Sequence, residues 1–377
     1  SIYGGQDYTI QLRALKKGPQ VIVGTPGRLM DHMRRGTLSV EDLSTLVLDE
    51  ADEMLKMGFI DDIEWILEQI PGEHQTALFS ATMPAPIQKI AKRYLKEAQK
   101  VLIKANHNAV DGIEQFYTVL PHRQKFDVLT RFLEVEDTKA AIIFARTKNT
   151  SSEVAEKLQS CGYIAAALNG DMAQAARKKV IDRIKTGSLD IVVATDVAAR
   201  GIDIERMSHV FNYDIPADEE TYVHRLGRTG RAGRKGKAFL FVTPRETRLL
   251  RSIEKTVNKA ITELQPPTGN EITAIRNKQL ADKIVGVIAK SKQLQSYRSM
   301  IESLIEEHAF SPVDVAAALS YLMQQTNAVT ISDPEPAERR PRSRSGASDG
   351  GRRTGGRPSV SRRRTGSGDS RRSSGRP

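Results

Sequence analysis

The 377-residue sequence contains a single cysteine and no apolar run of 18 or more residues. One cysteine excludes a disulfide framework, supports no zinc site, and is typical of a reducing compartment. Without a long apolar run, or a charged and then apolar leader, we expect neither a membrane span nor a secretory signal. The length suffices for two or three domains with their own cores. These features predict a cytoplasmic protein without a membrane partner.

A third absence concerns phosphate binding, because the loop G-x-x-x-x-G-K-[ST] of many nucleotide hydrolases does not occur in the sequence. Half of a nucleotide site is nevertheless present in TLVLDEADEML, residues 45–55, where a short apolar run leads into Asp49 and Glu50. Carboxylates at a strand end can hold Mg²⁺ through water and orient a water molecule that attacks a γ-phosphate. Asp49 would then hold the metal, and Glu50 would orient the attacking water. The alternative is an acidic helix start favoured by the helix dipole.

Short apolar runs alternate with longer amphipathic segments along most of the chain. Continuous apolar runs of this length indicate buried parallel strands in an α/β fold. They cover residues 21–23, 46–48, 77–79, 140–144, 191–194, 209–213 and 238–242. Ligands of open α/β sheets bind beyond the carboxyl ends of the strands. The polar or Gly-rich segments after five runs are therefore candidate sites, at 24–28, 49–52, 80–82, 146–148 and 195–196.

A cluster of basic residues lies in YVHRLGRTGRAGRKGK, residues 222–237. If a helix continues past Gly227, then His224, Arg228 and Arg231 share one face because they are spaced i, i+4 and i+7. Two guanidinium groups on one face suit a phosphate whose charge peaks in the transition state. The alternative is a basic surface that only contacts a nucleic acid backbone.

The pattern becomes helical beyond the prolines of QPPTGNE, residues 265–271. Ser311, Pro312 and Asp314 are expected to be the N-cap, the first and the third residue of the last helix. Apolar residues recur at helical spacing in three segments, and in the last helix they are expected to point inward. Those of the last helix are Val315, Ala318, Leu319, Leu322 and Met323; the first segment has Leu280, Ile284, Val287 and Ile288. Three short helices predict a docking or dimerisation module.

Positive charge is concentrated at the end of the chain. Residues 339–377 hold thirteen Arg, no Lys and two Asp, which equals the net charge of +11 of the whole sequence. The preceding residues are therefore formally neutral. Because the segment is made largely of Arg, Ser and Gly, it cannot bury enough apolar surface to fold and is predicted to be disordered.

Asp49-Glu50-Ala51-Asp52 resembles the signature of the DEAD-box ATP-dependent RNA helicases, and the other motifs match that family in order. They are Gly4-Gly5, Thr25-Pro26-Gly27-Arg28, Ser80-Ala81-Thr82, Phe144 to Thr147, Gln174 to Arg177, Ala194 to Asp203 and His224 to Arg231. The resemblance implies two RecA-like parallel-sheet domains, with ATP between them and RNA across both. Because the sequence opens without Met and inside a domain, we expect an N-terminally truncated first domain.

The family pattern and the changes in composition together predict six segments. They are 1–103, the C-terminal part of the first RecA-like domain; 104–112, a linker; 113–257, the second RecA-like domain; 258–272, a linker; 273–328, the helical module; and 329–377, the disordered tail.

The resemblance also implies the roles of individual residues. Asp49 and Glu50 would handle Mg²⁺ and the attacking water. The residues implied to contact the γ-phosphate are Arg228 and Arg231, and those touching the rest of the nucleotide are Gly201 and Asp203. Asp52 would couple through Ser80 and Thr82 to His224 in the second domain.

RNA contacts are implied for ten residues: Gly4, Gly5, Thr25, Gly27, Arg28, Thr147, Gly170, Gln174, Arg177 and Thr195. Contacts to phosphates and sugars hold the backbone without reading base sequence. The Arg-rich tail would add RNA affinity by counterion release, and it has no aromatic residue for base stacking. The alternative for the tail is a linker kept soluble by its charge.

The helical module resembles the dimerisation region of the bacterial cold-shock DEAD-box helicases, and residues 58–71 and 167–191 are similar to that subgroup. The subgroup implies a homodimer through 273–328 and a role in cold adaptation, ribosome assembly or mRNA turnover. Ribosomal RNA or mRNA would then be the target.

The sequence thus predicts an ATP-dependent RNA helicase that locally unwinds structured RNA. The alternative is a nucleotide-independent RNA-binding or annealing protein, because the phosphate loop is absent. A DNA helicase is disfavoured by the combination of motifs. Residues 1–377 alone are expected to hydrolyse little ATP, because Mg²⁺ lacks one ligand and the phosphates lack their cradle.

Overall fold

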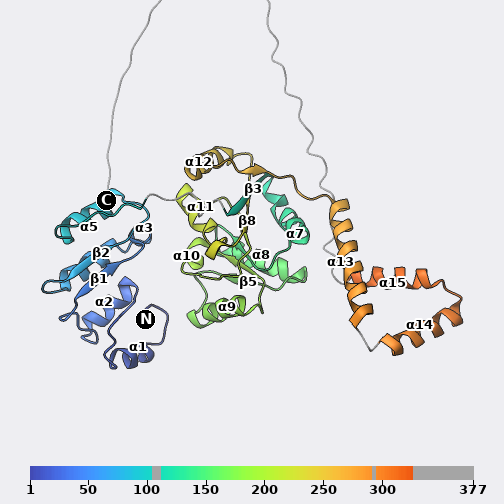
Figure 1. Ribbon diagram of the computed structural model, residues 1–377. Helices are drawn as coiled ribbons and strands as arrows, with labels where there is room; N and C mark the ends of the chain where they lie inside the picture. Colours follow the sequence, from blue (N-terminus) through green and yellow to red (C-terminus); the bar gives the residue numbers. More distant parts are fainter. Residues whose placement is uncertain (104–111, 291–293, 326–377) are drawn as a thin grey trace, which may run out of the picture. The chain divides into compact units, whose positions relative to one another are not determined.

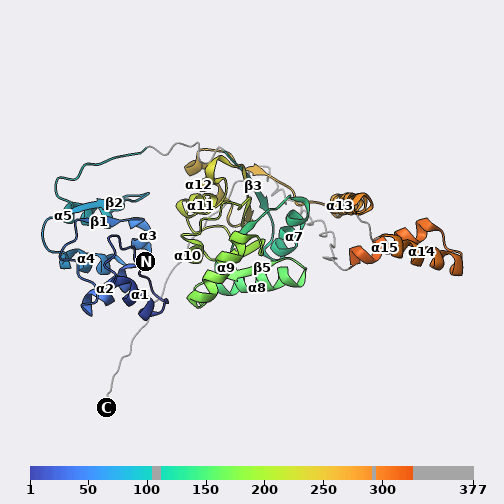
Figure 2. The same cartoon turned by 60° about the horizontal axis from the view of Figure 1, so that its bottom comes forward.

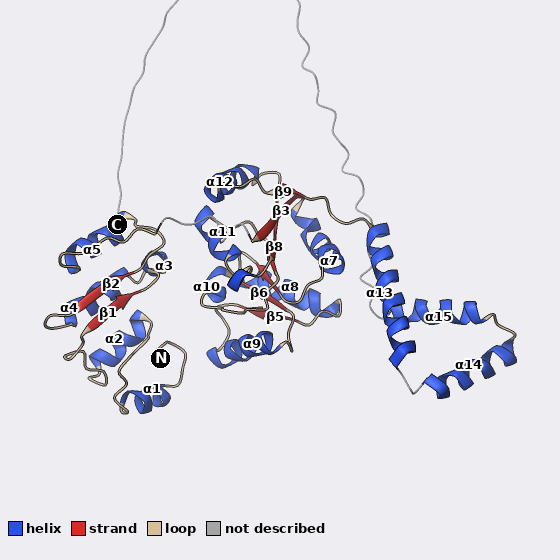
Figure 3. Ribbon diagram, viewed as in Figure 1, coloured by secondary structure: helices blue, strands red, loops and turns tan. Residues whose placement is uncertain are grey.

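A computed structural model describes residues 1–103, 112–290 and 294–325 (Figure 1). The predicted linker 104–112 and the predicted tail 329–377 lie almost entirely outside these residues. No helix within the described ranges is long and apolar enough to cross a membrane. Parallel strands with helices between them, as predicted, form the first two parts of the chain (Figure 3).

The first part, residues 1–103, is built around two parallel strands. Its elements are α1 (Tyr8–Leu15), α2 (Pro26–Arg34), β1 (Thr45–Leu48), α3 (Ala51–Lys56), α4 (Ile60–Gln69), β2 (Gln75–Leu78) and α5 (Ala85–Tyr94). Strand β1 pairs with β2 from Thr45 opposite Gln75 to Leu48 opposite Leu78. A small core of Leu48, Ile63, Leu67 and Ile90 lies between the strands and the helices α4 and α5.

The prediction of a strand at residues 21–23 is wrong. The segment is followed only by an isolated bridge between Ile2 and Gly24, and Val21 and Val23 are exposed rather than buried. The Ile2 amide donates to the Val23 carbonyl at 2.7 Å, and the Thr25 amide donates to the Ile2 carbonyl at 3.0 Å. An apolar run becomes a strand only where a neighbouring backbone completes the ladder, and here the pairing ends after one residue.

The second part contains a seven-stranded sheet, all of whose pairs are parallel, in the order β5-β6-β4-β7-β8-β3-β9. Its strands are β3 (Ile113–Val119), β4 (Ala141–Phe144), β5 (Ala165–Leu168), β6 (Ile191–Ala194), β7 (His209–Asn212), β8 (Gly236–Val242) and β9 (Thr262–Glu263). Its helices are η1 (His122–Gln124), α7 (Lys125–Val135), α8 (Lys148–Ser160), α9 (Gln174–Thr186), α10 (Asp196–Ala199), α11 (Glu219–Leu226), η2 (Arg231–Gly233) and α12 (Thr247–Val257).

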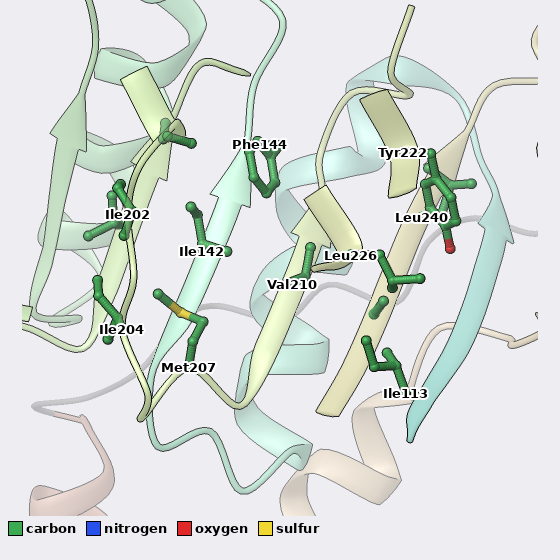
Figure 4. Packing of buried hydrophobic residues seen from close by; sticks show 14 of the residues in the cluster. Ile113, Ile142, Phe144, Ile202, Ile204, Met207, Val210, Tyr222, Leu226 and Leu240 are labelled. Carbon is green, nitrogen blue, oxygen red and sulfur yellow. The ribbon is translucent and has the colours of Figure 1, made fainter. Parts of the chain in front are cut away.

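Both faces of this sheet are buried, which explains its continuous apolar runs. Side chains alternate along β4, so Ile142 and Phe144 pack on one face, whereas Ala141 and Ile143 pack on the other. Helices α7 and α8 cover the second face, and α9 to α12 cover the first (Figure 2). Figure 4 shows the first face, where Ile142, Phe144 and Val210 of neighbouring strands meet Leu226 of α11.

The sheet extends beyond residue 257, where the sequence predicted the second domain to end. Strand β9 lies within the predicted linker 258–272 and pairs with β3 through Phe116 opposite Thr262 and Tyr117 opposite Glu263. Its two residues are polar and exposed, so they carry no apolar signal. The Thr118 side chain adds a hydrogen bond of 2.7 Å from its Oγ1 to the Leu264 carbonyl.

The last described helices are α13 (Gly269–Lys290), α14 (Leu294–His308) and α15 (Pro312–Gln325), and α13 is longer than predicted. Helix α13 begins with a capping box, in which the Thr268 amide donates to Glu271 Oε2 at 2.7 Å. Buried Ile272 and an ion pair of 3.0 Å from Arg276 Nε to Glu134 Oε2 attach it to α7. The predicted start of α15 is confirmed, because Ser311 Oγ accepts from the Val313 amide.

The expectation that the apolar side of α15 points inward is wrong for most of its residues. Val315 is buried, but Leu319, Leu322 and Met323 are 46%, 58% and 54% exposed. In α13, Val287 and Ile288 are exposed as well. Within the described residues, this apolar side is therefore largely exposed.

Candidate functional site

The acidic loop begins where β1 ends. Asp49 and Glu50 are exposed, and Glu50 adopts the left-handed conformation with φ 51°. This backbone conformation is unfavourable for a residue with a β-carbon. Two hydrogen bonds hold the turn: the Glu50 amide donates to Asp49 Oδ1 at 2.9 Å, and the Ala51 amide donates to the Phe79 carbonyl at 3.1 Å. The turn therefore presents two exposed carboxylates at the carboxyl edge of β1 and β2.

These carboxylates fit a metal that keeps most of its water. No group of three or more His, Cys, Asp or Glu within the described ranges could enclose a metal ion. Mg²⁺ is usually held by one or two carboxylates, water and substrate phosphates rather than by a protein cage. Asp49 with Glu50 could hold it in that way.

Asp52 joins the acidic loop to the segment after β2. Its Oδ2 accepts hydrogen bonds from the Thr82 amide at 2.8 Å and from Thr82 Oγ1 at 2.9 Å. The Asp52 amide donates to Ser80 Oγ at 3.1 Å, and Ser80 Oγ donates to the Thr82 carbonyl at 2.6 Å. Burial alone would raise the pKa of Asp52, but the bonds from Thr82 and Ser80 outweigh it and hold this pKa below its usual value. Asp52 is therefore a buried, ionised link between the two segments.

The shared face of the basic residues required a helix that continues past Gly227, and this condition is not met. Helix α11 stops at Leu226 with Gly227 as its C-cap, and Arg231 opens the short helix η2. Gly230 between them has φ 67°, and a β-carbon there would lie 2.7 Å from Ile113 Cγ1. His224, Arg228 and Arg231 therefore do not share one helical face, because Gly227 ends α11 and the left-handed Gly230 precedes η2.

Neighbouring groups orient both arginines that are predicted to contact the γ-phosphate. Arg228 Nε donates to the His224 carbonyl at 3.2 Å, and its Nη1 donates to the Ile202 carbonyl at 3.1 Å. Burial and the neighbouring Arg231 lower the pKa of Arg228. Arg231 Nε donates to the Gly227 carbonyl at 2.8 Å, and its Nη1 forms an ion pair with Asp203. The two guanidinium groups are thus oriented from the same turn.

Several predicted residues line one pocket. Glu50 lies in its lining with His224 and Arg228, and so do Glu53 and Arg200, which form an ion pair. Lys56 of α3 also pairs with Glu220 of α11, at 2.6 Å from Nζ to Oε2. The pocket lining does not include the predicted residues Asp49, Gly201, Asp203 and Arg231. The pocket therefore combines carboxylate and guanidinium groups, which suits a nucleotide phosphate with its metal.

The predicted RNA contacts of the first part gather around the start of α2. The Ile2 to Gly24 bridge brings Gly4 and Gly5 beside the segment that holds Thr25, Gly27 and Arg28. Thr25 is the N-cap of α2, and Gly27 lies in its first turn. Arg28 Nη1 donates to the Gln6 carbonyl at 3.3 Å and to Gln11 Oε1 at 3.2 Å.

In the second part, the predicted RNA contacts follow three neighbouring strands. Thr147 caps α8 after β4, accepting from the Thr150 amide at 3.1 Å, and Thr195 is the N-cap of α10 after β6. Gly170 and Gln174 follow β5, and Gln174 is the first residue of α9. Three helix starts at one edge of a sheet favour bound phosphate groups. A β-carbon on Gly5 would lie 3.3 Å from Gln174 Cβ, so the two sets of predicted contacts meet.

Arg177 differs from the other predicted RNA contacts because a backbone group already engages its side chain. Its Nη2 donates to the Ala198 carbonyl at 2.8 Å, and burial lowers its pKa. This bond ties α9 to α10. Arg177 could therefore position the start of α10 as well as contact a phosphate.

Sequence reasoning missed a buried polar network behind Arg28. His32 and Gln11 are fully buried, and His32 Nε2 lies 3.0 Å from Gln11 Oε1. The Tyr8 ring stacks on His32 at 4.4 Å and faces the guanidinium groups of Arg28 and Arg35. Burial and the charge of Arg28 lower the pKa of His32. The position of His32, four residues after Arg28 on one helix, was the only available signal.

Arg225 was also missed, although it lies inside the basic motif. Its Nε and Nη2 bond the two carboxylate oxygens of Asp196 at 2.5 and 2.8 Å. Its Nη1 donates to Asn212 Oδ1 at 3.0 Å and to the Asp214 carbonyl at 2.7 Å. Asp214 in turn forms a buried pair of 2.8 Å with Lys125 Nζ. Arg225 therefore holds α10 against α11, which carries His224.

Three family descriptions match the chain. Residues 1–90 match the DEAD/DEAH box helicase family, residues 124–233 match the helicase conserved C-terminal domain, and residues 267–334 match the RNA helicase DeaD dimerization domain.

Individual relatives are similar over most of the chain. The ATP-dependent RNA helicase DeaD of Haemophilus influenzae is 51% identical over 93% of this chain and 57% of its own length. The DEAD-box ATP-dependent RNA helicase CshA of Geobacillus kaustophilus is 48% identical over 94% of this chain and 76% of its own length. The chain thus spans little more than half the length of the DeaD relatives.

Among solved structures, Dbp5 of S. cerevisiae bound to RNA and ADP BeF3 is 34% identical, with a TM-score of 0.63. The likeness covers 73% of this chain and 72% of that one.

Proposed function

The chain belongs to the DEAD-box ATP-dependent RNA helicases, and we propose that its intact protein couples ATP hydrolysis to local unwinding of structured RNA. The observation that carries the proposal is the pocket in which Glu50 lies with His224 and Arg228. A carboxylate that orients water and a guanidinium that meets the γ-phosphate are the groups that phosphoryl transfer requires.

We assign the chemistry as follows. Asp49 holds Mg²⁺ through water, and Glu50 orients the attacking water. A bound Mg²⁺ would neutralise part of the phosphate charge. Arg228 and Arg231 bind the γ-phosphate, and Gly201 and Asp203 contact the nucleotide.

Coupling between the two parts runs through Asp52, Ser80, Thr82 and His224. Thr82 and Ser80 bond Asp52 directly, and His224 lines the pocket next to the acidic loop. A change at the nucleotide would therefore reach the segment after β2.

RNA crosses both parts in this proposal. It contacts Gly4, Gly5, Thr25, Gly27, Arg28, Thr147, Gly170, Gln174, Arg177 and Thr195. Helix starts and arginines that bind phosphates support recognition without sequence preference. Structured RNA, such as ribosomal RNA or mRNA, is the proposed target, and cold adaptation, ribosome assembly or mRNA turnover the proposed context. This function and the single cysteine favour the cytoplasm.

We propose that two copies associate through residues 273–328. The exposed apolar side chains of α13 and α15 and the match to a dimerization domain over residues 267–334 support this. The six segments predicted from the sequence remain our proposed division of the chain, with β9 added to the second domain.

The alternative function is nucleotide-independent RNA binding or annealing, which the absent phosphate loop and the Arg-rich tail favour. RNA-stimulated ATP hydrolysis and strand displacement by the complete gene product separate the two functions. We expect both activities, with residues 1–377 alone hydrolysing little ATP. RNA annealing without hydrolysis by the complete product would support the alternative and refute the helicase proposal.

A further inference from the structure

Helix α12 carries a row of basic side chains that no predicted motif includes. Its apolar residues Leu250, Ile253 and Val257 are buried in the core of the second part. On the exposed side, Arg248, Arg251 and Lys255 are spaced i, i+3 and i+7, which places them along one face. Arg245 and Lys259, just outside the helix, are also exposed. We call Arg248, Arg251 and Lys255 the α12 basic face.

These cations have no acidic partner within the part of the chain that the structure describes. The two acids nearest in sequence are engaged elsewhere. Glu246 Oε2 accepts from Thr243 Oγ1 at 2.8 Å, and Glu246 Oε1 accepts from Arg146. Glu254 Oε1 accepts from the Ile261 amide at 3.1 Å. Glu246 and Glu254 are thus bonded away from the face, whereas Glu219 of α11 accepts a hydrogen bond from Ser252 without forming an ion pair with the three cations.

The basic face lines a surface groove with Thr247 and Ser252. No large apolar side chain of α12 is exposed. Protein interfaces generally include an apolar or aromatic centre, whereas a cationic groove without one suits a phosphate backbone. The composition therefore favours a nucleic acid over an acidic protein.

The position of α12 connects the face to the proposed RNA path. Helix α12 follows β8, so it starts at the same sheet edge as Thr147 and Thr195. Arg146, the neighbour of Thr147, reaches Glu246 with 3.3 Å between Nη2 and Oε1. Both views of the fold show α12 beside α11 (Figures 1 and 2).

We propose that the α12 basic face is a second RNA-binding surface, which holds the phosphate backbone of RNA that extends beyond the motif residues. From Arg248 to Lys255 a helix rises about 10 Å. Since one strand of a duplex carries about one charge every 3.4 Å of its axis, the face spans about three phosphates. The inference rests on the proposed function only in assuming that the chain binds RNA.

The test compares two triple variants of the chain with equal loss of charge. The first is Arg248→Gln with Arg251→Gln and Lys255→Gln. The control is Lys139→Gln with Lys157→Gln and Lys185→Gln, which are exposed lysines at or near the opposite, amino edge of the sheet. Affinity for an RNA duplex with a single-stranded extension is measured over a series of salt concentrations, after thermal melting has shown that both variants fold.

We expect the first variant to bind RNA about tenfold or more weakly at low salt, with a salt slope lower by about 2 to 3, because three phosphate contacts are lost. The control should change the slope by much less. Equal effects in both variants would mean that only the loss of net charge matters, and this would overturn the proposal.

Chemical acetylation of lysines, read by mass spectrometry, maps the contact directly in the unsubstituted chain. RNA should protect Lys255, while Lys139 and Lys185 stay reactive. An unprotected Lys255 together with an unchanged salt slope would overturn the proposal and leave an acidic protein as the ligand class. If the unsubstituted chain binds no RNA, the proposed function itself fails together with this inference.

Discussion

The two parallel sheets of this chain support their functional loops very differently. The seven-stranded sheet is covered on both faces, and Phe239 of its inner strand β8 is 1% exposed. The two-stranded sheet leaves Val47 53% exposed, and Phe79, the residue directly after β2, is 58% exposed, although the acidic loop follows β1 directly. The arginines and the helix starts of the second part therefore follow strands that are packed in a closed core. The carboxylates lie on a strand pair with few supporting contacts, so substitutions of the same type should have very different costs in the two sheets.

The largest contrast is expected from one substitution in the seven-stranded sheet and the same substitution directly after the two-stranded sheet. Phe239→Ala should lower the free energy of unfolding of the second part by about 3–5 kcal/mol, because it empties a closed core. Phe79→Ala, at an exposed site, should change stability by less than about 1 kcal/mol. Chemical denaturation followed by circular dichroism measures both. Equal losses would show that the two sheets are packed alike.

A smaller contrast is expected at two glycines with positive φ. Gly230→Ala should cost about 2–3 kcal/mol, because the backbone is strained and the new β-carbon would meet Ile113. Gly72→Ala, with φ 79° and open space around it, should cost about 1 kcal/mol. Thermal melting of the two variants checks this order, and a larger loss at Gly72 would contradict it.

The smallest effect concerns pH and the buried pair of the second part. Burial by itself would raise the pKa of Asp214, but Lys125 and the Arg146 amide outweigh it and lower this pKa. Because the folded pKa lies below the unfolded value, the pair stabilises the fold above pH about 4, and this contribution fades as the pH falls through the folded pKa.

Asp214→Asn tests this pH dependence, because it removes the titrating group. The unfolding midpoint of the second part, measured from pH 7 down to about pH 3, should fall less steeply in this variant. Parallel curves for the variant and the unsubstituted chain would assign the acid sensitivity to other groups.

The sequence allowed most of the second sheet to be predicted, because strands buried on both faces are continuous apolar runs. The same rule failed at residues 21–23, where the apolar run forms only one bridge. It also missed β3 and β5, as well as β9, whose Thr262 and Glu263 are polar. Pairing between distant segments decides these cases, and a local pattern does not contain it.

The site residues show a similar division. Motif matches placed Asp52 beside Ser80 and Thr82, where the hydrogen bonds indeed lie. They did not predict the left-handed turn at Glu50 or the four bonds of Arg225. These features depend on contacts between segments far apart in the sequence. The roles of the site residues stay predictions until activity is measured.

The central claim is that Glu50 and Arg228 act on the same nucleotide. The most direct test is RNA-stimulated ATP hydrolysis by the complete gene product, in a cycle of Glu50→Gln, Arg228→Lys and the double variant. Each single change should lower the rate by about 100-fold or more, and the double variant should lose far less than the product of both factors, because groups that act as a unit are not additive. Independent, multiplying losses, or an unchanged rate in either single variant, would contradict the account.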